Sequence, residues 1–561
     1  MKLQLNRKYI HQDLFEELGF DDYLKKFEIH LPMLTTLVLS PMEKEEGLQH
    51  FNELSQLSSK SLQQKVDIEE LLSLSARILP LDSSLGTLET GNIEQYQLYL
   101  IDTYITHELL LQEEEKNHPL HLPLESLLQT KKILLDFCEE GAKIIKLSSE
   151  EKALKEEIYL NDRKLETELQ AHEKEISELT SLSLLYPYPR ELINPSTELI
   201  EKIKSCPKLK LEEKGEIYII HHELLPEVKQ LEEKVKTLRE QLENEVKVRL
   251  HDLGGRLLPF FQDIRFSYEQ RKKRVFLYAL CHSIDHLKLA LPEFVEQGIH
   301  LENGHLPCLE KANLENYVPL DLTLKADGSH VLFGANMAGK TSVLKTLYFF
   351  LTLIRLGLPL PVSKMTLRYP EQVEIHLKNS GKIRQKLSGF ADELNFFSKD
   401  FSSGTYLLID ELFHSTNPLA GLELSKVFLS HYAEKDLLLF CTSFYPEVLY
   451  MKGIHFYKML DSSLDVDDER PVEEVLSQTP FRIEKLEASD VGKSFWESQQ
   501  PLKLALHFPL NDELKKNIKA ASNYITNNGI RKTNYDKRSY KFNSKSRIYI
   551  NSYTKRVCLE Y

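Results

Sequence analysis

The sequence has few cysteines and no long apolar segment. Its six cysteines are scattered, so neither a disulfide framework nor a zinc cage is expected, and the thiols should be buried and reduced. The longest apolar stretch, residues 348–362, is shorter than the roughly 20 residues that span a bilayer, and it contains Arg355. Residues 1–7 lack the apolar segment of a secretory signal. These absences predict a cytoplasmic protein that does not enter a membrane.

Glycine and proline are not enriched, at 21 and 23 of 561 residues, which excludes collagen-like and mucin-like chains. With 42% hydrophobic and 28% charged residues, the chain also differs from wholly disordered proteins. Its length allows about three or four domains of roughly 150 residues each. The composition therefore indicates a globular protein with a large core.

Charge is distributed unevenly along the chain. The formal net charge is −14, but residues 515–561 contain twelve Lys and Arg against Asp536 and Glu560, a net charge of +10. The rest of the chain therefore has a net charge of −24. Because residues 515–561 are also rich in Asn and Tyr and lack helical periodicity, we expect a basic, disordered tail.

Residues 1–300 have their apolar side chains mostly at helical spacing. Two long helices are predicted near 149–180 and 223–250, separated by proline-containing segments at 186–189 and 206–207. The simplest arrangement is an antiparallel pair of lever helices within a mostly α-helical domain. Core helices of an ordinary bundle remain the alternative.

Residues 301–514 have a different pattern, in which short β-type runs alternate with helical stretches. This alternation indicates a mixed or parallel sheet with helices on its faces. The expected strands lie at 331–333, 373–377, 406–409 and 437–440, and the expected helices include 342–353 and 422–433.

Residues 334–341 (GANMAGKT) fit the phosphate-loop pattern G-x-x-x-x-G-K-[ST] between an expected strand and an expected helix. In such a loop, backbone N–H groups and the helix N-terminus face phosphate oxygens. Lys340 would place a positive charge at the β- and γ-phosphates, and the Thr341 hydroxyl would bind Mg²⁺. The predicted nucleotide-binding residues are Gly334, Ala335, Asn336, Met337, Ala338, Gly339, Lys340, Thr341 and Ser342.

An acidic pair, Asp410 and Glu411, follows the expected strand at 406–409. Hydrolysis of a bound nucleotide needs such a pair at the end of a second buried strand. Asp410 would hold Mg²⁺, and Glu411 would polarise the attacking water. Glu411 and Lys340 are therefore the predicted catalytic residues.

Three motifs together resemble the ATPase domain of MutS-type proteins. Residues 336–340, 388–394 and 410–411 are similar to the family's N-M-x-G-K, S-x-F-x-x-E-[ML] and D-E motifs. The resemblance covers about residues 301–520. It implies an α/β P-loop (ABC-like) ATPase domain, at 301–514, preceded by a mostly α-helical core and lever domain with long antiparallel helices.

The resemblance also implies roles for single residues. Tyr317, in an element similar to the family's F-x-P, would stack on adenine, and Asn336 would approach the γ-phosphate. Ser388 would act in trans, on the nucleotide of a partner protomer. The implied assembly is an ATP-gated homodimer or heterodimer through the ATPase domain, with ATP and Mg²⁺ as cofactors.

Two positions depart from the family pattern. Ser443 stands where the family has a histidine that senses the γ-phosphate, so the rate of hydrolysis is expected to differ. Ala420 stands where the family has an acidic residue before Gly421. This second departure alters contacts that the resemblance places between protomers.

The sequence leaves two functions open. The loop 416–418 (Thr-Asn-Pro) and the overall size of the chain resemble the MutS-related component of the lysine 5,6-aminomutase reactivase. The main prediction is therefore an ATPase that remodels or reactivates an adenosylcobalamin-dependent aminomutase. The alternative is a DNA-binding ATPase of mismatch repair or recombination, which the acidic body disfavours. Phe15 and Glu17 match the sequence pattern of the mismatch-reading F-x-E motif. They lie in an expected helix without the strands that surround that motif, so a mismatch-reading role is not expected.

Overall fold

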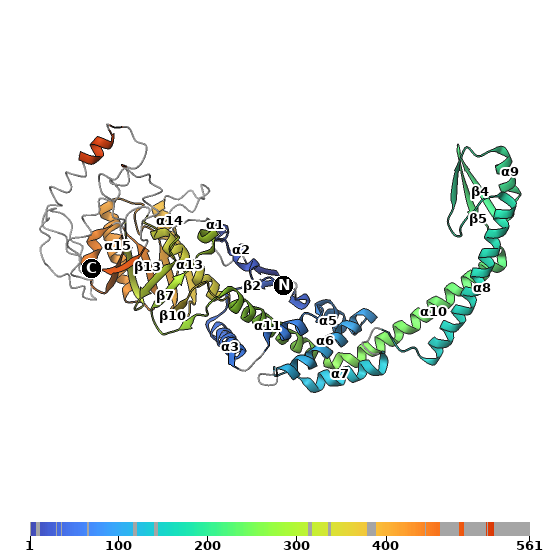
Figure 1. Ribbon diagram of the computed structural model, residues 1–561, viewed down its shortest axis with the longest axis horizontal. Helices are drawn as coiled ribbons and strands as arrows, with labels where there is room; N and C mark the ends of the chain where they lie inside the picture. The colour runs from blue at the N-terminus through green and yellow to red at the C-terminus, as the bar shows by residue number, and fades with distance from the viewer. Residues whose placement is uncertain are drawn as a thin grey trace, which may run out of the picture. The chain divides into compact units, whose positions relative to one another are not determined.

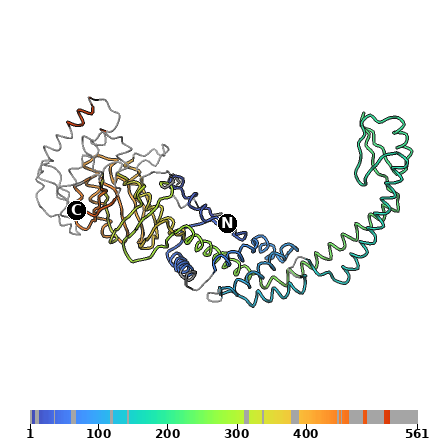
Figure 2. Tube along the Cα trace, viewed as in Figure 1, coloured from blue at the N-terminus to red at the C-terminus, as the bar shows by residue number. Residues whose placement is uncertain are grey.

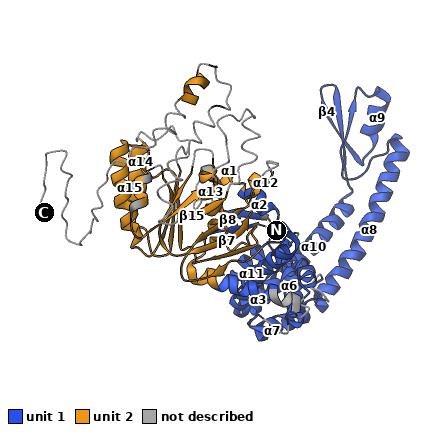
Figure 3. Ribbon diagram, turned by 60° about the vertical axis from the view of Figure 1, so that its left-hand side comes forward, with its two compact units in different colours: residues 1–9, 20–40, 49–289 blue, residues 10–19, 41–48, 290–561 orange. Residues whose placement is uncertain are grey.

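The structure is a computed structural model of the chain. Its contacts divide the chain into two compact units (Figure 3). Unit 1 comprises residues 1–9, 20–40 and 49–289, and unit 2 comprises residues 10–19, 41–48 and 290–561. The structure describes residues 2–6, 12–29, 31–34, 36–63, 67–115, 120–139, 144–311, 317–334, 338–377, 389–443, 445–460, 482–486, 506, 512 and 514–520.

Unit 1 is mostly helical, and its core includes a buried ion cluster. Arg271 of α11, which is 0% exposed, donates to the carboxylates of Glu108 and Glu115, and the Tyr278 hydroxyl also bonds to Glu115. These bonds connect α11 with Glu108 of α6 and with Glu115, the residue that caps the C-terminus of α6. The helices and strands of this part are β1 (Lys2–Leu5), α2 (Phe20–Lys25), η2 (Pro32–Leu34), β2 (Thr36–Leu39), α3 (Lys44–Gln63, which begins in unit 2), α4 (Ile68–Ser75), α5 (Asp82–Glu89), α6 (Gln95–Glu114), α7 (Leu124–Phe137), η4 (Leu258–Phe260) and α11 (Phe261–Leu287).

The two long helices predicted from the sequence are α8 (Ser149–Thr180) and α10 (Pro226–Leu257), which pack side by side (Figure 1). A capping box between Ser148 and Glu151 starts α8. The second helix starts and ends later than the expected 223–250, because the strand β5 (Ile217–His222) precedes it and because the proline at position 226 favours the first turn of a helix.

A small sheet and a helix connect the two long helices (Figure 2). From the sequence, only proline-containing segments that interrupt helices were predicted here. All three strands are antiparallel, in the order β3-β5-β4. Apolar side chains of this sheet pack with Ile176 of α8 and Ile203 of α9. The elements are β3 (Arg190–Ile193), α9 (Thr197–Ser205), β4 (Leu209–Lys214) and β5 (Ile217–His222).

Unit 2 is a mixed α/β body built on a six-stranded sheet in the order β11-β12-β13-β9-β14-β15 (Figure 1). Along this order, each strand from β11 to β14, including β9, runs parallel to its neighbours, and β15 pairs antiparallel with β14. All four strands expected from the sequence are present. The elements are β9 (Gly328–Phe333), α13 (Lys340–Arg355), β11 (Gln372–His376), α14 (Gly389–Phe397), β12 (Thr405–Ile409), α15 (Pro418–Ala433), β13 (Leu438–Thr442), η5 (Pro446–Tyr450), β14 (Ile454–Met459) and β15 (Ile483–Leu486).

A second, four-stranded sheet of unit 2 has the order β6-β10-β7-β8. Its register shifts between Leu301 and Gly304, where β7 pairs with β8. The sheet begins before residue 301, so it crosses the boundary that the sequence predicted between helical and ATPase domains. The elements are β6 (Glu293–Phe294), β7 (Ile299–Gly304), α12 (Pro307–Lys311), β8 (Leu320–Leu324) and β10 (Lys364–Leu367).

Two segments near the N-terminus belong to unit 2 rather than to the helical region. Glu17, at the end of α1 (Gln12–Glu17), pairs with Lys345 of α13, and the Met42 N–H donates to the Arg355 carbonyl at 2.7 Å. Phe15 is 4% exposed, so its ring is part of a core and is not presented to a base pair. The F-x-E match is therefore structural.

The described part of the chain holds five of the six cysteines, and all five are free thiols. Four of them are buried, as the sequence predicted, and Cys308 is intermediate. Within the same residues, no helix is long and apolar enough to cross a membrane. The basic tail lies outside the described residues except for 515–520.

Candidate active site

The candidate site lies where three neighbouring strands of the six-stranded sheet end. Because β12, β13 and β9 are parallel, their carboxyl ends share one edge of the sheet. The predicted phosphate loop follows β9, Asp410 and Glu411 follow β12, and Ser443 follows β13. Residues far apart in the sequence thereby meet at one edge.

The phosphate loop leads into α13 through Gly339. This residue has φ 90°, a left-handed conformation that glycine adopts without strain, and it is the N-cap of the helix. Lys340, 6% exposed, donates from Nζ to the Gly334 carbonyl at 2.8 Å. Burial lowers the pKa of Lys340, and the carboxylates of Asp410 and Glu411 oppose that shift.

Not all of the predicted loop can be placed. Ala335, Asn336 and Met337 lie outside the described residues. Ala338 is buried and Ser342 is exposed at the start of α13. Their roles toward a nucleotide stay predictions.

Thr341 and Asp410, the two predicted Mg²⁺ ligands, lie within hydrogen-bond distance of each other. Thr341 Oγ1 donates to Asp410 Oδ2 at 2.8 Å. Adjacent ligands of an octahedral Mg²⁺, each about 2.1 Å from the ion, lie about 3.0 Å apart. The hydroxyl and carboxylate oxygens are also the hard ligands that this ion prefers, so the two residues fit a bound Mg²⁺.

Thr442, at the end of β13, connects the two acidic residues. Its hydroxyl donates to Asp410 Oδ1 at 2.8 Å and accepts from the Glu411 N–H at 2.7 Å. Glu411 has φ 57°, a conformation that costs a residue with a side chain about 1–3 kcal/mol. The hydrogen bond to Thr442 therefore stabilises a strained backbone at the predicted catalytic carboxylate.

A second strained residue, Phe413 with φ 53°, lies two positions further along. Its N–H donates to Glu393 Oε1 at 2.5 Å, and its carbonyl accepts from the Tyr445 hydroxyl at 2.9 Å. Glu393 belongs to α14 and is 2% exposed. Burial raises the pKa of Glu393 to about 7, although the hydrogen bond from Phe413 lowers it.

The remaining predicted residues lie around this edge or outside the described chain. Ser443 is buried, and its Oγ accepts from the Tyr445 N–H at 3.1 Å. The Tyr317 hydroxyl accepts from the Leu306 N–H at 2.6 Å, which fixes it beside the turn after β7. Ser388 lies outside the described residues.

No role was predicted for Thr442 or Glu393 from the sequence. For Thr442, the available signal was a polar residue that ends an apolar strand next to the strand of the acidic pair. For Glu393, the signal was the glutamate of the S-x-F-x-x-E-[ML] motif. Neither signal shows which residue is contacted, because Thr442 binds Glu411, 31 residues away in sequence, and Glu393 binds Phe413, 20 residues away.

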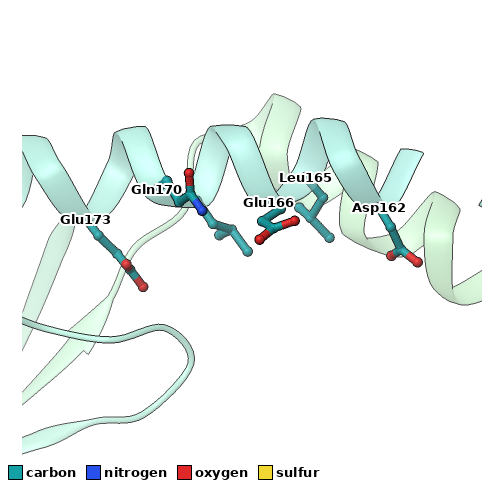
Figure 4. Close-up of a pocket in the computed structure, with 6 residues that line it drawn as sticks. Asp162, Leu165, Glu166, Gln170 and Glu173 are labelled. Carbon is teal, nitrogen blue, oxygen red and sulfur yellow. The ribbon is translucent and has the colours of Figure 1, made fainter. Parts of the chain in front are cut away.

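A cavity along α8, in unit 1, is separate from the candidate site (Figure 4). Two of its carboxylates are engaged: Asp162 accepts from Arg239 at 2.8 Å, and Glu173 accepts from the Tyr186 N–H at 2.8 Å. Its acidic lining would repel phosphate groups. The lining residues are Asp162, Leu165, Glu166, Leu169, Gln170 and Glu173.

Comparison with known proteins finds similarity to MutS2 and MSH3 proteins, although no protein-family model matches the chain. The endonuclease MutS2 of Enterococcus faecalis is 30% identical over 280 residues, which are 47% of this chain and 35% of that protein. The DNA mismatch repair protein MSH3 of Arabidopsis thaliana is 29% identical over 167 residues, which are 28% of this chain and 15% of that protein. A MutS2 of Alkaliphilus metalliredigens is 28% identical over 225 residues, 37% of this chain and 28% of that protein.

These matches support membership of the MutS family, as the motifs suggested. The matched region spans about a third or less of each relative, with 35% the largest share among the three. The relatives carry the names of an endonuclease and a mismatch repair protein. They therefore favour the DNA-related alternative over reactivation of an aminomutase.

Proposed function

We propose that the chain is a MutS-type ATPase whose unit 2 binds and hydrolyses ATP and whose nucleotide cycle is coupled to DNA binding. The observation that carries the ATPase is the Thr341–Asp410 hydrogen bond of 2.8 Å at the edge where β12, β13 and β9 end. It supports a Mg²⁺ site next to a phosphate loop, the combination that phosphoryl transfer requires.

Each residue of the site has a distinct task in this proposal. Lys340 moves from the Gly334 carbonyl to the β- and γ-phosphates, and Thr341 and Asp410 hold Mg²⁺. When bound, Mg²⁺ neutralises phosphate charge. Glu411 accepts the proton of the attacking water, which then bonds to the γ-phosphorus as ADP leaves.

The proposal also includes the partner protomer and the base of the nucleotide. Ser388 acts in trans in a homodimer or heterodimer formed through unit 2, and Tyr317 stacks on adenine. Both roles rest on the resemblance to the MutS family. Because Ser443 replaces a histidine at a buried position, the chain should hydrolyse ATP more slowly than a relative with that histidine.

DNA is the proposed partner because the relatives are a MutS2 endonuclease and a mismatch repair protein. The basic segment 515–561, with a net charge of +10, would neutralise phosphates, since the body of the chain is acidic. A second candidate partner, an adenosylcobalamin-dependent aminomutase, rests only on the likeness of the loop 416–418 to that of the reactivase component.

The test measures ATP turnover of the full chain alone, with duplex or branched DNA, and with a candidate aminomutase. Stimulation by DNA that is lost on deleting 515–561 supports the proposal. Stimulation by the aminomutase alone, with no DNA binding at low salt, replaces DNA by the second candidate. Lys340→Ala should abolish nucleotide binding, and unchanged turnover in this variant would overturn the ATPase itself.

A further inference from the structure

The turn after β12 is held by a carboxylate that the proposed reaction does not use. Glu393 accepts the Phe413 N–H at 2.5 Å, and Phe413 lies two residues beyond Glu411. Both Glu411 and Phe413 have positive φ, at 57° and 53°. Residues with side chains rarely adopt this conformation unless their surroundings impose it.

The surroundings of the turn hold it in this conformation, through contacts from β13, from Tyr445 after β13 and from α14. Thr442 of β13 accepts the Glu411 N–H at 2.7 Å, and the Tyr445 hydroxyl donates to the Phe413 carbonyl at 2.9 Å. The ring of Phe413 stacks on Phe397 of α14, with centroids 5.6 Å apart. Glu393 supplies the hydrogen bond from α14, so this helix fixes both the ring and the backbone of Phe413.

A carboxyl group is an unfavourable side chain for this buried position. Glu393 is 2% exposed, and within the described part of the chain no cation pairs with it. Burial of a carboxyl without a cation is unfavourable unless hydrogen bonds compensate it. The feature that distinguishes this carboxyl from an apolar side chain is the bond that it accepts from Phe413.

We propose that Glu393 is a positioning residue for Glu411. By holding the N–H of Phe413, it fixes the turn 411–413 and thereby the direction in which the Glu411 carboxylate points. This inference rests on the proposed function, in which Glu411 activates water. It adds a residue that contacts neither nucleotide nor metal but sets the geometry of the one that contacts water.

The kinetic test compares Glu393→Ala with Glu393→Gln in the full chain, with Asp392→Asn on the same helix as a control. Glu393→Ala should lower kcat for ATP about 30-fold with KM within about twofold, because misplacement of a catalytic group affects chemistry more than binding. Glu393→Gln keeps a carbonyl oxygen that can accept the bond, so its kcat should stay within about threefold of the parent. A Gln variant as slow as the Ala variant, or equal kcat in all chains, overturns the proposal.

Hydrogen exchange provides a readout that does not depend on turnover. The amides of 411–413 should exchange faster in Glu393→Ala than in the parent or in Glu393→Gln, while the amides of β12 stay protected. Unchanged exchange at 411–413 overturns the positioning role. If the parent hydrolyses no ATP but its exchange responds as stated, the proposed function fails while Glu393 still holds the turn.

Discussion

The buried carboxyl of Glu393 should make the stability of unit 2 depend on pH, and glutamine at this position should remove that dependence. Burial raises the pKa of Glu393 from its ordinary 4.5 to about 7. The folded state therefore binds this proton more tightly than the unfolded state. The resulting stabilisation is fully present below pH 4.5 and is lost as the pH rises to about 7.

The magnitude follows from the two pKa values. At about 1.4 kcal/mol for each pH unit, the interval from 4.5 to about 7 corresponds to about 3.5 kcal/mol, of which about 3 kcal/mol is lost between pH 4.5 and 8. The side chain is only 2% exposed, so solvent does little to screen this effect. The free energy of unfolding of the parent, relative to that of Glu393→Gln, should therefore fall by about 3 kcal/mol between acid and neutral pH.

The assay is urea unfolding of both chains at several pH values between 4.5 and 8, followed by hydrogen exchange of the β12 and β13 amides. The comparison between variants cancels the pH dependence of every other group. Glu434→Gln, at an exposed position, serves as the control. If the difference in free energy of unfolding between the parent and Glu393→Gln did not change with pH, the reasoning would be refuted, because the Glu393 carboxyl would then titrate as it does in water.

Two further predictions concern unit 1 and are checked by urea unfolding followed by circular dichroism. In α10, a Cβ at Gly254 would lie 2.3 Å from the Gly91 carbonyl oxygen, whereas a Cβ at Gly255 would meet no atom within 4 Å. Gly254→Ala should therefore lower the free energy of unfolding by about 1–3 kcal/mol, and Gly255→Ala should not lower it. Arg271→Met should cost about 3–5 kcal/mol because it leaves two glutamates buried without their cation, and the exposed Arg265→Met should change stability by less than about 0.5 kcal/mol. Equal effects within either pair would contradict the packing or the ion cluster.

Four strands of the six-stranded sheet and the position of the acidic pair were predictable because their signals are local. An apolar run that ends in Asp410 and Glu411 carries its own pattern, as does a loop that begins at Gly334 and leads into a helix. The parallel sheet then brings the two together, because parallel strands share an edge for their carboxyl ends.

The contacts that hold the catalytic turn were not predictable from the sequence. Thr442 and Glu393 act on residues 31 and 20 positions away, and only the fold creates those contacts. The small sheet between α8 and α10 was not predictable for the same reason, since its strands are short and its apolar side chains pack against α8 and α9. The assignment of residues 10–19 to unit 2 likewise depends on long-range contacts such as Glu17 with Lys345.

The central claim is that the residues at the edge of β12, β13 and β9 hydrolyse ATP. The most direct measurement is single-turnover hydrolysis of ATP with Mg²⁺ by the full chain and by Glu411→Gln, with ATP binding measured in parallel. The account predicts that the variant binds ATP as the parent does but hydrolyses it at least about 100-fold more slowly, the contribution of a general base. Equal hydrolysis by both chains, or loss of ATP binding in Glu411→Gln, would contradict it.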